Sequence, residues 1–98
     1  MSRFEDEVET FVGALRYERE MAENTCLSYG RDLRSFGDYL KSRGIGAAAE
    51  VTRETIAEYV RGERTQGRSA ATRARRLVAV KQFFRYLKER RMVSADPT

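Results

Sequence analysis

The chain has 98 residues, of which 41% are hydrophobic and 35% charged, and its formal net charge at pH 7 is +4. A chain of this length buries roughly 60% of its unfolded surface, so the composition fits one domain with a single core. One cysteine and no histidine exclude an internal disulfide and leave no zinc-ligand set, and the acidic N-terminus does not fit a signal peptide. We therefore expect a cytoplasmic protein without cofactor, metal or membrane-spanning segment.

A first helix is predicted near the N-terminus. Its apolar residues recur at the spacing of one helical face, and they are Phe4, Val8, Phe11, Val12 and Leu15. Ser2 can cap this helix, and the carboxylates at residues 5–7 complement the exposed amides of its first turns. The acidity of this segment therefore has a local structural explanation.

A second helix is predicted over residues 23–42. Its core-facing stripe covers about a third of the circumference and consists of Cys26, Tyr29, Leu33, Phe36, Gly37 and Leu40. The opposite, outer face carries Asn24, Ser28, Arg31, Ser35 and Asp38. Glycine inside a helix costs about 1 kcal/mol relative to alanine, so Gly30 and Gly37 indicate a closely packed neighbouring helix. Gly44 marks the end of the second helix.

Two more helices follow the loop GIGAAAE. Thr52 can cap the third helix while Val51 packs onto Ile56, and this helix is short, ending before the polar segment TQGR. Ser69 can cap the fourth helix, which we expect to run to about Arg90.

The predicted fold is all-α, because no segment shows the alternation of a strand. We expect a compact bundle of four helices, or five if a frayed turn near the C-terminus forms a helix. Residues 1–93 are expected to form the domain, and residues 94–98 to begin a linker.

The fourth helix has an apolar arc that spans more than half of its circumference, which is typical of a helix packed among others. We place in this arc Ala74, Leu77, Val78, Val80, Phe83, Phe84 and Leu87. The opposite strip is predicted to hold Thr72, Arg75, Ala79, Gln82 and Tyr86. Arg73, Arg76 and Lys81 fall at the margins of the arc, which fits a protruding helix end in anionic surroundings. The free amides of its first turn also suit phosphate.

Charge is unevenly distributed along the chain. Residues 1–50 contain 7 basic and 10 acidic side chains, whereas residues 51–98 contain 12 basic and 5 acidic ones. Such an asymmetric field suits a polyanion, although solvated helix faces of an arginine-rich protein would have the same composition. Because Phe83 and Phe84 are expected in the core rather than stacked on bases, the pattern favours duplex DNA over a single strand.

Two motifs and a terminal Asp-Pro occur in a specific order. The segment YEREMAENTCLSYGRDLRSFGDYLKSRG comes first, SAATRARRLVAVKQFFRYL follows, and DP stands at residues 96 and 97. In this order the chain resembles the N-terminal, core-binding (SAM-like) domain of tyrosine recombinases and phage integrases, most closely those of the XerC/XerD type. Its first motif is matched at Glu18, Arg19, Met21, Asn24, Thr25, Tyr29, Asp32, Leu33 and Phe36. Its second motif is matched at Ser69, Thr72, Arg75, Leu77, Val80, Phe83, Phe84, Tyr86 and Leu87.

The chain departs from the family's pattern at three positions. Alanine at 22 and valine at 78 replace a common serine, and Lys81 replaces a common arginine. The loss of a capping hydroxyl at Ala22 predicts that the second helix begins a residue or two late.

The resemblance implies a clamp on duplex DNA. In that family this domain grips a recombination half-site while a separate C-terminal domain cleaves and rejoins the strands, in an assembly with other recombinase subunits. The expected DNA contacts are Asn24, Thr25, Ser28, Arg31, Arg68, Ser69, Thr72, Arg73, Arg75, Arg76 and Lys81. No catalytic residue is assigned, since the tyrosines lie in helical patterns and the chain has no histidine, and we expect the isolated domain to be a monomer.

Two other classes of protein remain open at this level. One is a helical interaction module whose arginine-rich helix docks on an acidic protein partner. The other is a freestanding helix-turn-helix regulator, which the spacing of the last two helices does not favour.

Overall fold

The computed structural model describes residues 3–98 and contains four α-helices and one short 3-10 helix. In chain order they are α1 (Arg3–Tyr17), α2 (Glu23–Ser42), η1 (Ala48–Glu50), α3 (Arg53–Thr65) and α4 (Ala70–Glu89). No strand occurs in this part of the chain, so the predicted all-α bundle is confirmed. The fifth, short element lies before α3 rather than near the C-terminus. No helix within residues 3–98 has the length and apolarity needed to cross a membrane.

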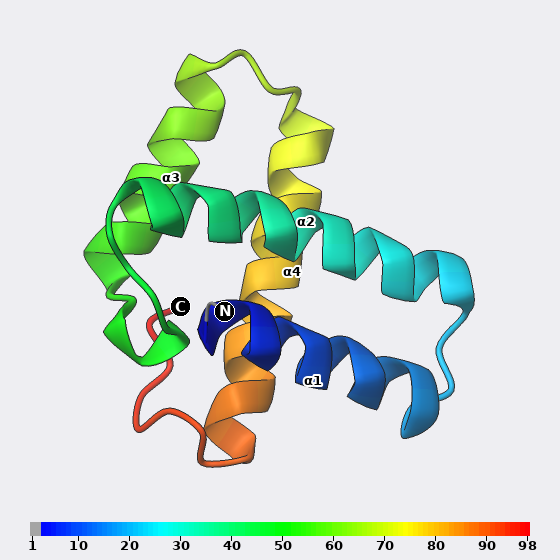
Figure 1. Ribbon diagram of the computed structural model, residues 1–98. Coiled ribbons are helices and arrows are strands. Elements are labelled where there is room, and N and C mark those ends of the chain that lie inside the picture. Colours follow the sequence, from blue (N-terminus) through cyan, green and yellow to red (C-terminus); the bar gives the residue numbers. More distant parts are fainter. Residues whose placement is uncertain (1–2) are drawn as a thin grey trace.

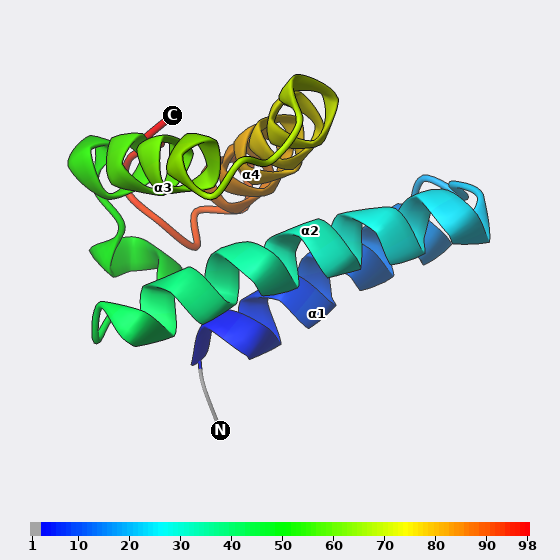
Figure 2. The same cartoon turned by 90° about the horizontal axis from the view of Figure 1, so that it is seen from above.

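The helices form two layers that cross. Helices α1 and α2 lie side by side in one layer, and α3 and α4 make up the other (Figure 2). Figure 1 shows α2 passing over the middle of α4, so that the N-terminal turns of α4 extend beyond α2 on one side. This extension leaves the start of α4 less covered than its C-terminal half.

An aromatic cluster joins the two layers. Phe83 of α4 lies edge-on to Phe4 and Phe11 of α1, with ring centroids 5.4 and 5.6 Å apart. Phe36 of α2 meets Phe84 of α4 in the same manner at 6.4 Å. All five side chains are almost completely buried, and edge-to-face pairs contribute about 0.5 to 1.5 kcal/mol each beyond their buried area. The prediction that Phe83 and Phe84 belong to the core is confirmed.

The predicted helix starts are confirmed where side chains make them. The Thr52 hydroxyl accepts a hydrogen bond from the Thr55 amide in a capping box, and the Ser69 hydroxyl accepts one from the Thr72 amide. Helix α2 begins at Glu23 although Ala22 supplies no side-chain cap, so the expected late start does not occur. Ser2, the predicted cap of α1, lies outside the described residues.

Three helices end in the same kind of left-handed turn. In each, the residue two positions past the last helical residue has a positive φ, and its amide donates to the carbonyl three residues earlier. This residue is Gly44 after α2 (φ +72°) and Gly67 after α3 (φ +77°), but it is Arg91 after α4 (φ +58°). The Met92 amide then donates to the Leu87 carbonyl at 2.9 Å. A left-handed conformation costs a residue with a Cβ atom about 1 to 2 kcal/mol, so α4 ends under backbone strain.

Gly37 allows the close approach of α1 and α2 that its presence in a helix predicts. A Cβ atom at this position would lie 3.1 Å from the ring of Phe4, which is packed against Phe36 and Phe83. At Gly30 the nearest side-chain atom would be 3.9 Å away, an ordinary contact. Close packing therefore explains Gly37 and does not explain Gly30.

The acidic start of α1 has a second role that its sequence did not indicate. Glu7 is buried, and its carboxylate accepts a hydrogen bond from the Ala48 amide of η1 at 3.0 Å. A buried backbone donor needs such a partner. Glu7 therefore fixes the loop between α2 and α3 onto α1, in addition to lying in the first turns of its own helix.

The predicted faces of α4 are partly wrong. Ala74 and Val78, placed in the apolar arc, are exposed, whereas Ala79 and Tyr86, placed on the opposite strip, are buried. The Tyr86 ring packs against Phe11 at 5.2 Å. Helix α4 contacts α1, α2 and α3. Its buried side is therefore rotated about the helix axis, relative to the predicted arc, toward the strip that carries Arg75, and Val78 faces outward.

Replacing the strained residue after α4 by glycine is expected to stabilise the protein. Arg91→Gly relieves the left-handed strain and costs some chain entropy, so the free energy of unfolding should rise by about 0.5 to 1 kcal/mol. Gly44→Ala is the matched control, because a Cβ there meets nothing within 4 Å and only the backbone effect remains. In urea denaturation, the free energy of unfolding should rise for Arg91→Gly and fall for Gly44→Ala. Changes of the same sign in the two variants contradict the backbone strain assigned to Arg91.

Candidate nucleic-acid interface

Most of the residues predicted to contact DNA lie on the first half of α2, on the first turns of α4 and in the turn before α4. On α2, Asn24 and Arg31 are exposed, and Thr25 and Ser28 are half-buried. On α4 and the turn before it, Arg68, Ser69 and Arg75 are exposed, and Thr72, Arg73 and Arg76 are half-buried. Lys81 is exposed but lies apart, because it is six residues, or about 9 Å along the helix, beyond Arg75 and about 120° around the axis from it.

The start of α4 is held in place by its own side chains. The Ser69 hydroxyl donates to the Thr72 hydroxyl at 3.0 Å and accepts from the Thr72 amide at 3.1 Å. Arg73 donates through Nε to the Arg68 carbonyl at 3.2 Å. Both hydroxyls therefore have a structural role at the start of the helix. The sequence predicted such a role for Ser69, as a cap, but not for Thr72.

Arg75 forms a two-fold hydrogen bond to Asp32 of α2. Its Nε donates to Asp32 Oδ2 at 2.9 Å and its Nη2 donates to Oδ1 at 2.8 Å. The Asp32 side chain is 2% exposed and that of Arg75 is 50% exposed. The carboxylate, through its hydrogen bonds and its charge, raises the pKa of Arg75 above its ordinary value. This contact joins the middle of α2 to α4 where the two helices cross.

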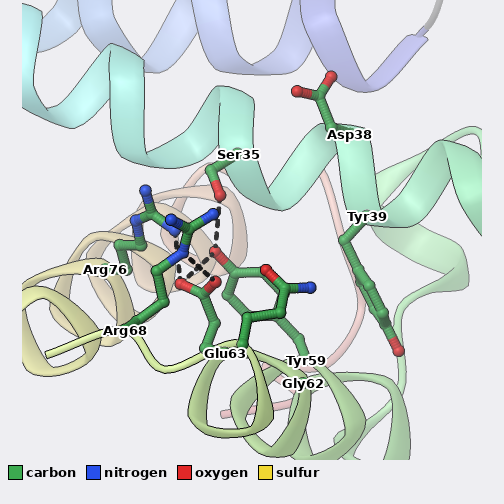
Figure 3. A pocket seen from close by; sticks show the side chains of 9 residues that line it. Ser35, Asp38, Tyr39, Tyr59, Gly62, Glu63, Arg68 and Arg76 are labelled. Atoms are coloured by element: carbon green, nitrogen blue, oxygen red, sulfur yellow. Dashed lines mark hydrogen bonds and ion pairs between the residues drawn. The ribbon is translucent and has the colours of Figure 1, made fainter. Parts of the chain in front are cut away.

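A second carboxylate, that of Glu63 on α3, gathers the remaining groups at the start of α4. Arg76 donates to it through Nη1 at 2.6 Å, and Arg68 through Nε at 3.4 Å. The Tyr59 hydroxyl also donates to Glu63, at 3.4 Å, and lies 3.1 Å from the Ser35 hydroxyl. Figure 3 shows the two guanidinium groups converging on this one carboxylate.

Arg76 is far less accessible than its neighbours. Its side chain is only 17% exposed, and its Nε has no hydrogen-bond acceptor and lies 3.9 Å from Asp32 Oδ1. The hydrogen bond to Glu63 is the main cause that raises the pKa of Arg76, and burial opposes it. The position of Arg76 at the margin of the apolar arc predicted anionic surroundings. The carboxylates of Glu63 and Asp32 supply these surroundings within the protein.

An open cleft of about 490 Å³ lies beside this network, between α2 and the end of α3. Its lining includes Glu63, Arg68 and Arg76 together with Tyr39, Tyr59 and Asp38. Its two acids and two arginines compensate one another in charge, and Figure 3 shows Asp38 on α2 and Glu63 on α3. No group of side chains among residues 3–98 has the composition of a metal site.

Other cations on these helices remain without carboxylate partners. Among residues 3–98, no ion pair involves Arg31 or Arg34 on α2, or Arg73 and Lys81 on α4. The predicted set thus divides into paired arginines (Arg68, Arg75 and Arg76) and unpaired cations (Arg31, Arg73 and Lys81). The unpaired cations are the ones able to neutralise an external anion without first losing an internal partner.

Sequence reasoning missed the two acids that organise the site. Asp32 was noted only as a motif position, and Glu63 was not noted at all. The position of Asp32 was a usable signal, because it precedes Leu33 and lies beside the predicted core stripe of α2. A carboxylate near a core needs a cationic or hydrogen-bonding partner. Glu63 has a comparable signal, because it follows Ile56 by seven residues and Tyr59 by four and so falls on the same buried face of the helix.

Comparisons with known proteins give a consistent picture. Residues 8–91 match the model of a family described as phage integrase, N-terminal SAM-like domain. The tyrosine recombinase XerD of Halalkalibacterium halodurans is 33% identical over 99 residues, which cover 100% of this chain and 33% of that protein. The tyrosine recombinase XerC of Roseiflexus castenholzii is 36% identical over 93 residues, which cover 95% of this chain and 30% of that protein. The chain thus spans about a third of the length of these curated relatives.

Removing the charge of Glu63 is expected to destabilise the fold. Glu63→Gln leaves Arg76 with only the Asp32 carboxylate, which is 3.9 Å away and already bonded to Arg75. A largely buried cation that has lost its hydrogen-bonded partner should lower the free energy of unfolding by about 2 to 4 kcal/mol. Glu89→Gln is the matched control, because the Arg85–Glu89 pair is exposed on both sides and such pairs contribute less than about 1 kcal/mol. Equal losses in urea denaturation are the result that contradicts a structural role for Glu63.

The Tyr59 phenol should titrate at unusually high pH. Burial raises the pKa of Tyr59 above its ordinary value of 10.0, and the nearby Glu63 charge acts in the same direction against the Ser35 hydrogen bond. The pKa of Tyr59 is therefore higher in the folded state than in the unfolded state, and this difference contributes to the free energy of unfolding. The contribution is complete below about pH 10 and is lost as the pH rises through the folded-state pKa. The difference in tyrosinate absorbance between wild type and Tyr59→Phe should have its midpoint above pH 10, and a midpoint at or below 10 contradicts the prediction.

Proposed function

We propose, since this chain belongs to the family of phage integrase N-terminal, SAM-like domains, that it binds duplex DNA in site-specific recombination. The relatives that it matches along almost its whole length are named tyrosine recombinases. More specifically, the chain clamps one recombination half-site and positions it for a separate catalytic domain. Other recombinase subunits are the expected partners in the complete protein.

The observation that carries this proposal is the placement of the unpaired cations. Arg31 is exposed on α2, and Arg73 belongs to the first turns of α4, the part of this helix that extends beyond α2 (Figure 1). Cations that lack carboxylate partners neutralise DNA phosphates without an exchange of ion pairs, and this neutralisation releases counterions. The two helices thus both offer cationic side chains close in sequence to the Asp32–Arg75 contact that joins them.

The start of α4 is suited to a DNA groove for a second reason. It is a helix end with short hydroxyl side chains and arginines, a mixture that serves both phosphate and base-edge contacts. Its first turn is rigid, because Ser69, Thr72 and Arg73 are bonded to their neighbours. A rigid contact surface loses little conformational entropy on binding.

Strand cleavage is assigned to another part of the recombinase. A tyrosine nucleophile must be accessible and surrounded by groups that stabilise the developing charge on the phosphate. Tyr29, Tyr39, Tyr59 and Tyr86 are packed against other rings. Tyr17 is 77% exposed at the far end of α1, with Arg16 beside its ring. None of these surroundings is that of a nucleophile.

We further propose that the DNA-binding domain extends to residue 93 and that residues 94–98 begin a linker. Val93 is buried in the core, whereas Ser94 and Ala95 are exposed. A domain boundary is expected where buried contacts give way to exposed chain.

Charge reversal on α4 should weaken DNA binding more than the same change elsewhere. Arg73→Glu replaces an unpaired cation on the proposed surface, and the dissociation constant for a fluorescent duplex should rise about fivefold to tenfold. Arg53→Glu is the matched control, because Arg53 is an exposed cation without an ion pair among the described residues, at the start of α3. Fluorescence anisotropy between about 50 and 200 mM salt measures both variants and the salt dependence.

Two results would contradict the proposal. One is equal affinity of wild type and Arg73→Glu at the lowest salt concentration. The other is an affinity for duplex DNA that does not fall with salt, together with saturable binding of an acidic protein, which is the behaviour of an interaction module.

A further inference from the structure

We propose that Asp32 is a positioning residue, which holds the guanidinium of Arg75 so that its free edge directs two parallel N–H donors at duplex DNA. The inference deepens the proposed function and rests on it. It assigns a role at the DNA surface to an acidic residue that touches no DNA itself.

The hydrogen-bond inventory of Arg75 leaves one edge of the guanidinium unused. The group has five N–H donors in a planar fork. Asp32 accepts from Nε and from one hydrogen of Nη2. The two terminal nitrogens therefore retain a pair of parallel N–H bonds, which lie on the edge opposite to the side chain.

Burial differs sharply between the two ends of this contact. The Asp32 carboxylate is almost completely enclosed, while half of the Arg75 side chain is exposed. The carboxylate therefore works as a fixed anchor, and the exposed part of the arginine is on the solvent side of that anchor. An arginine held in this way has already lost most of the rotamer freedom that binding would otherwise remove.

Other arginine pairs of the protein lack this combination. Arg76 and Arg68 share Glu63, and Arg76 is mostly covered. Arg16 makes a similar two-fold contact with Glu23, but there the carboxylate is 60% exposed and the arginine is 32% exposed. Among the arginine pairs within residues 3–98, only that of Arg75 combines a two-fold bond to a buried acid with an arginine side chain that is half exposed.

The charge of Asp32 opposes DNA binding, and this makes the inference testable. A negative group near a phosphate backbone is repulsive, so its removal should tighten binding if charge alone matters. If Asp32 instead orients Arg75, its removal should weaken binding although the net charge of the protein becomes more positive. The two explanations predict changes of opposite sign.

The free edge of Arg75 suits a pair of acceptors on one rigid group. Two phosphate oxygens fit this edge, and so do O6 and N7 of guanine in the major groove. The shared chemistry is a two-fold acceptor of duplex DNA, and the two sources differ in their dependence on salt and on base identity.

A double-mutant cycle tests the positioning role. The proteins are wild type, Asp32→Asn, Arg75→Ala and the double variant, and anisotropy with the same fluorescent duplex measures their dissociation constants. Thermal unfolding of each protein confirms that it is folded at the assay temperature. We expect Asp32→Asn and Arg75→Ala each to weaken binding about fivefold or more, and the double variant to bind no more weakly than Arg75→Ala.

The outcomes separate this inference from the proposed function. Binding by Asp32→Asn that equals or exceeds that of wild type overturns the positioning role, as does additive weakening in the double variant. Unchanged binding by Arg75→Ala overturns it too, while salt-dependent wild-type binding still supports the DNA-binding function. If wild type does not bind the duplex at all, the proposed function fails, and this inference fails with it.

A duplex in which every guanine is replaced by 7-deazaguanine identifies the acceptor. This base lacks the N7 acceptor and leaves the phosphates unchanged. If Arg75 contacts guanine, wild type should lose about fivefold in affinity and Arg75→Ala should lose nothing. If Arg75 contacts phosphate, both proteins should bind the two duplexes alike, and Arg75→Ala should reduce the salt slope by about 1. A third pattern, with equal losses for both proteins and an unchanged slope, overturns the assigned contact.

Arg75→Lys decides the matter if Asp32→Asn does not fold. Lysine keeps the charge but has no planar fork, so the positioning role predicts binding as weak as that of Arg75→Ala. Wild-type affinity of the lysine variant overturns the inference.

Discussion

The contact between Asp32 and Arg75 determines how the two helices of the candidate interface are related. It lies where α2 crosses α4 and joins an almost fully buried carboxylate to an arginine side chain that is half exposed. A buried carboxylate without a partner would cost several kcal/mol, whereas a well-formed pair offsets much of that cost. The crossing is thus specified in a way that apolar packing alone does not provide, because only one register of the two helices brings these groups together.

Glu63 performs the corresponding task between α3 and α4. It accepts from Arg76, Arg68 and Tyr59, so the end of α3, the connecting turn and the first turns of α4 meet at one carboxylate. Together with Asp32 it forms a polar layer of buried acids that meet at Arg76. Polar networks of this kind cost little when their members are bonded and fix a single arrangement of the helices. The unpaired Nε of Arg76 is the exception within the layer.

This arrangement explains why a surface proposed to bind DNA is built over acidic residues. Arginines crowded at one helix end repel one another, and carboxylates beneath them reduce that repulsion in the free protein. The acids also decide which cations remain available. Arg31 and Arg73 lack carboxylate partners within the described residues, Arg75 retains a free edge, and Arg76 is engaged. The effective interface is therefore smaller and more ordered than the count of basic residues indicates.

Local signals in the sequence determined the helices, the caps at Thr52 and Ser69, the end of α2 at Gly44 and the aromatic core, because each depends on spacing within a few residues. The family also followed from the sequence, since its two motifs occur in order along nearly the whole chain. The rotation of α4 about its axis did not, and Val78 and Tyr86 were assigned to the wrong faces. Periodicity gives the width of an apolar arc, but the directions from which neighbouring helices cover it depend on how the two layers cross. For the same reason only the tertiary structure decided that Asp32 and Glu63, which are 43 and 13 residues from their arginine partners, hold the start of α4.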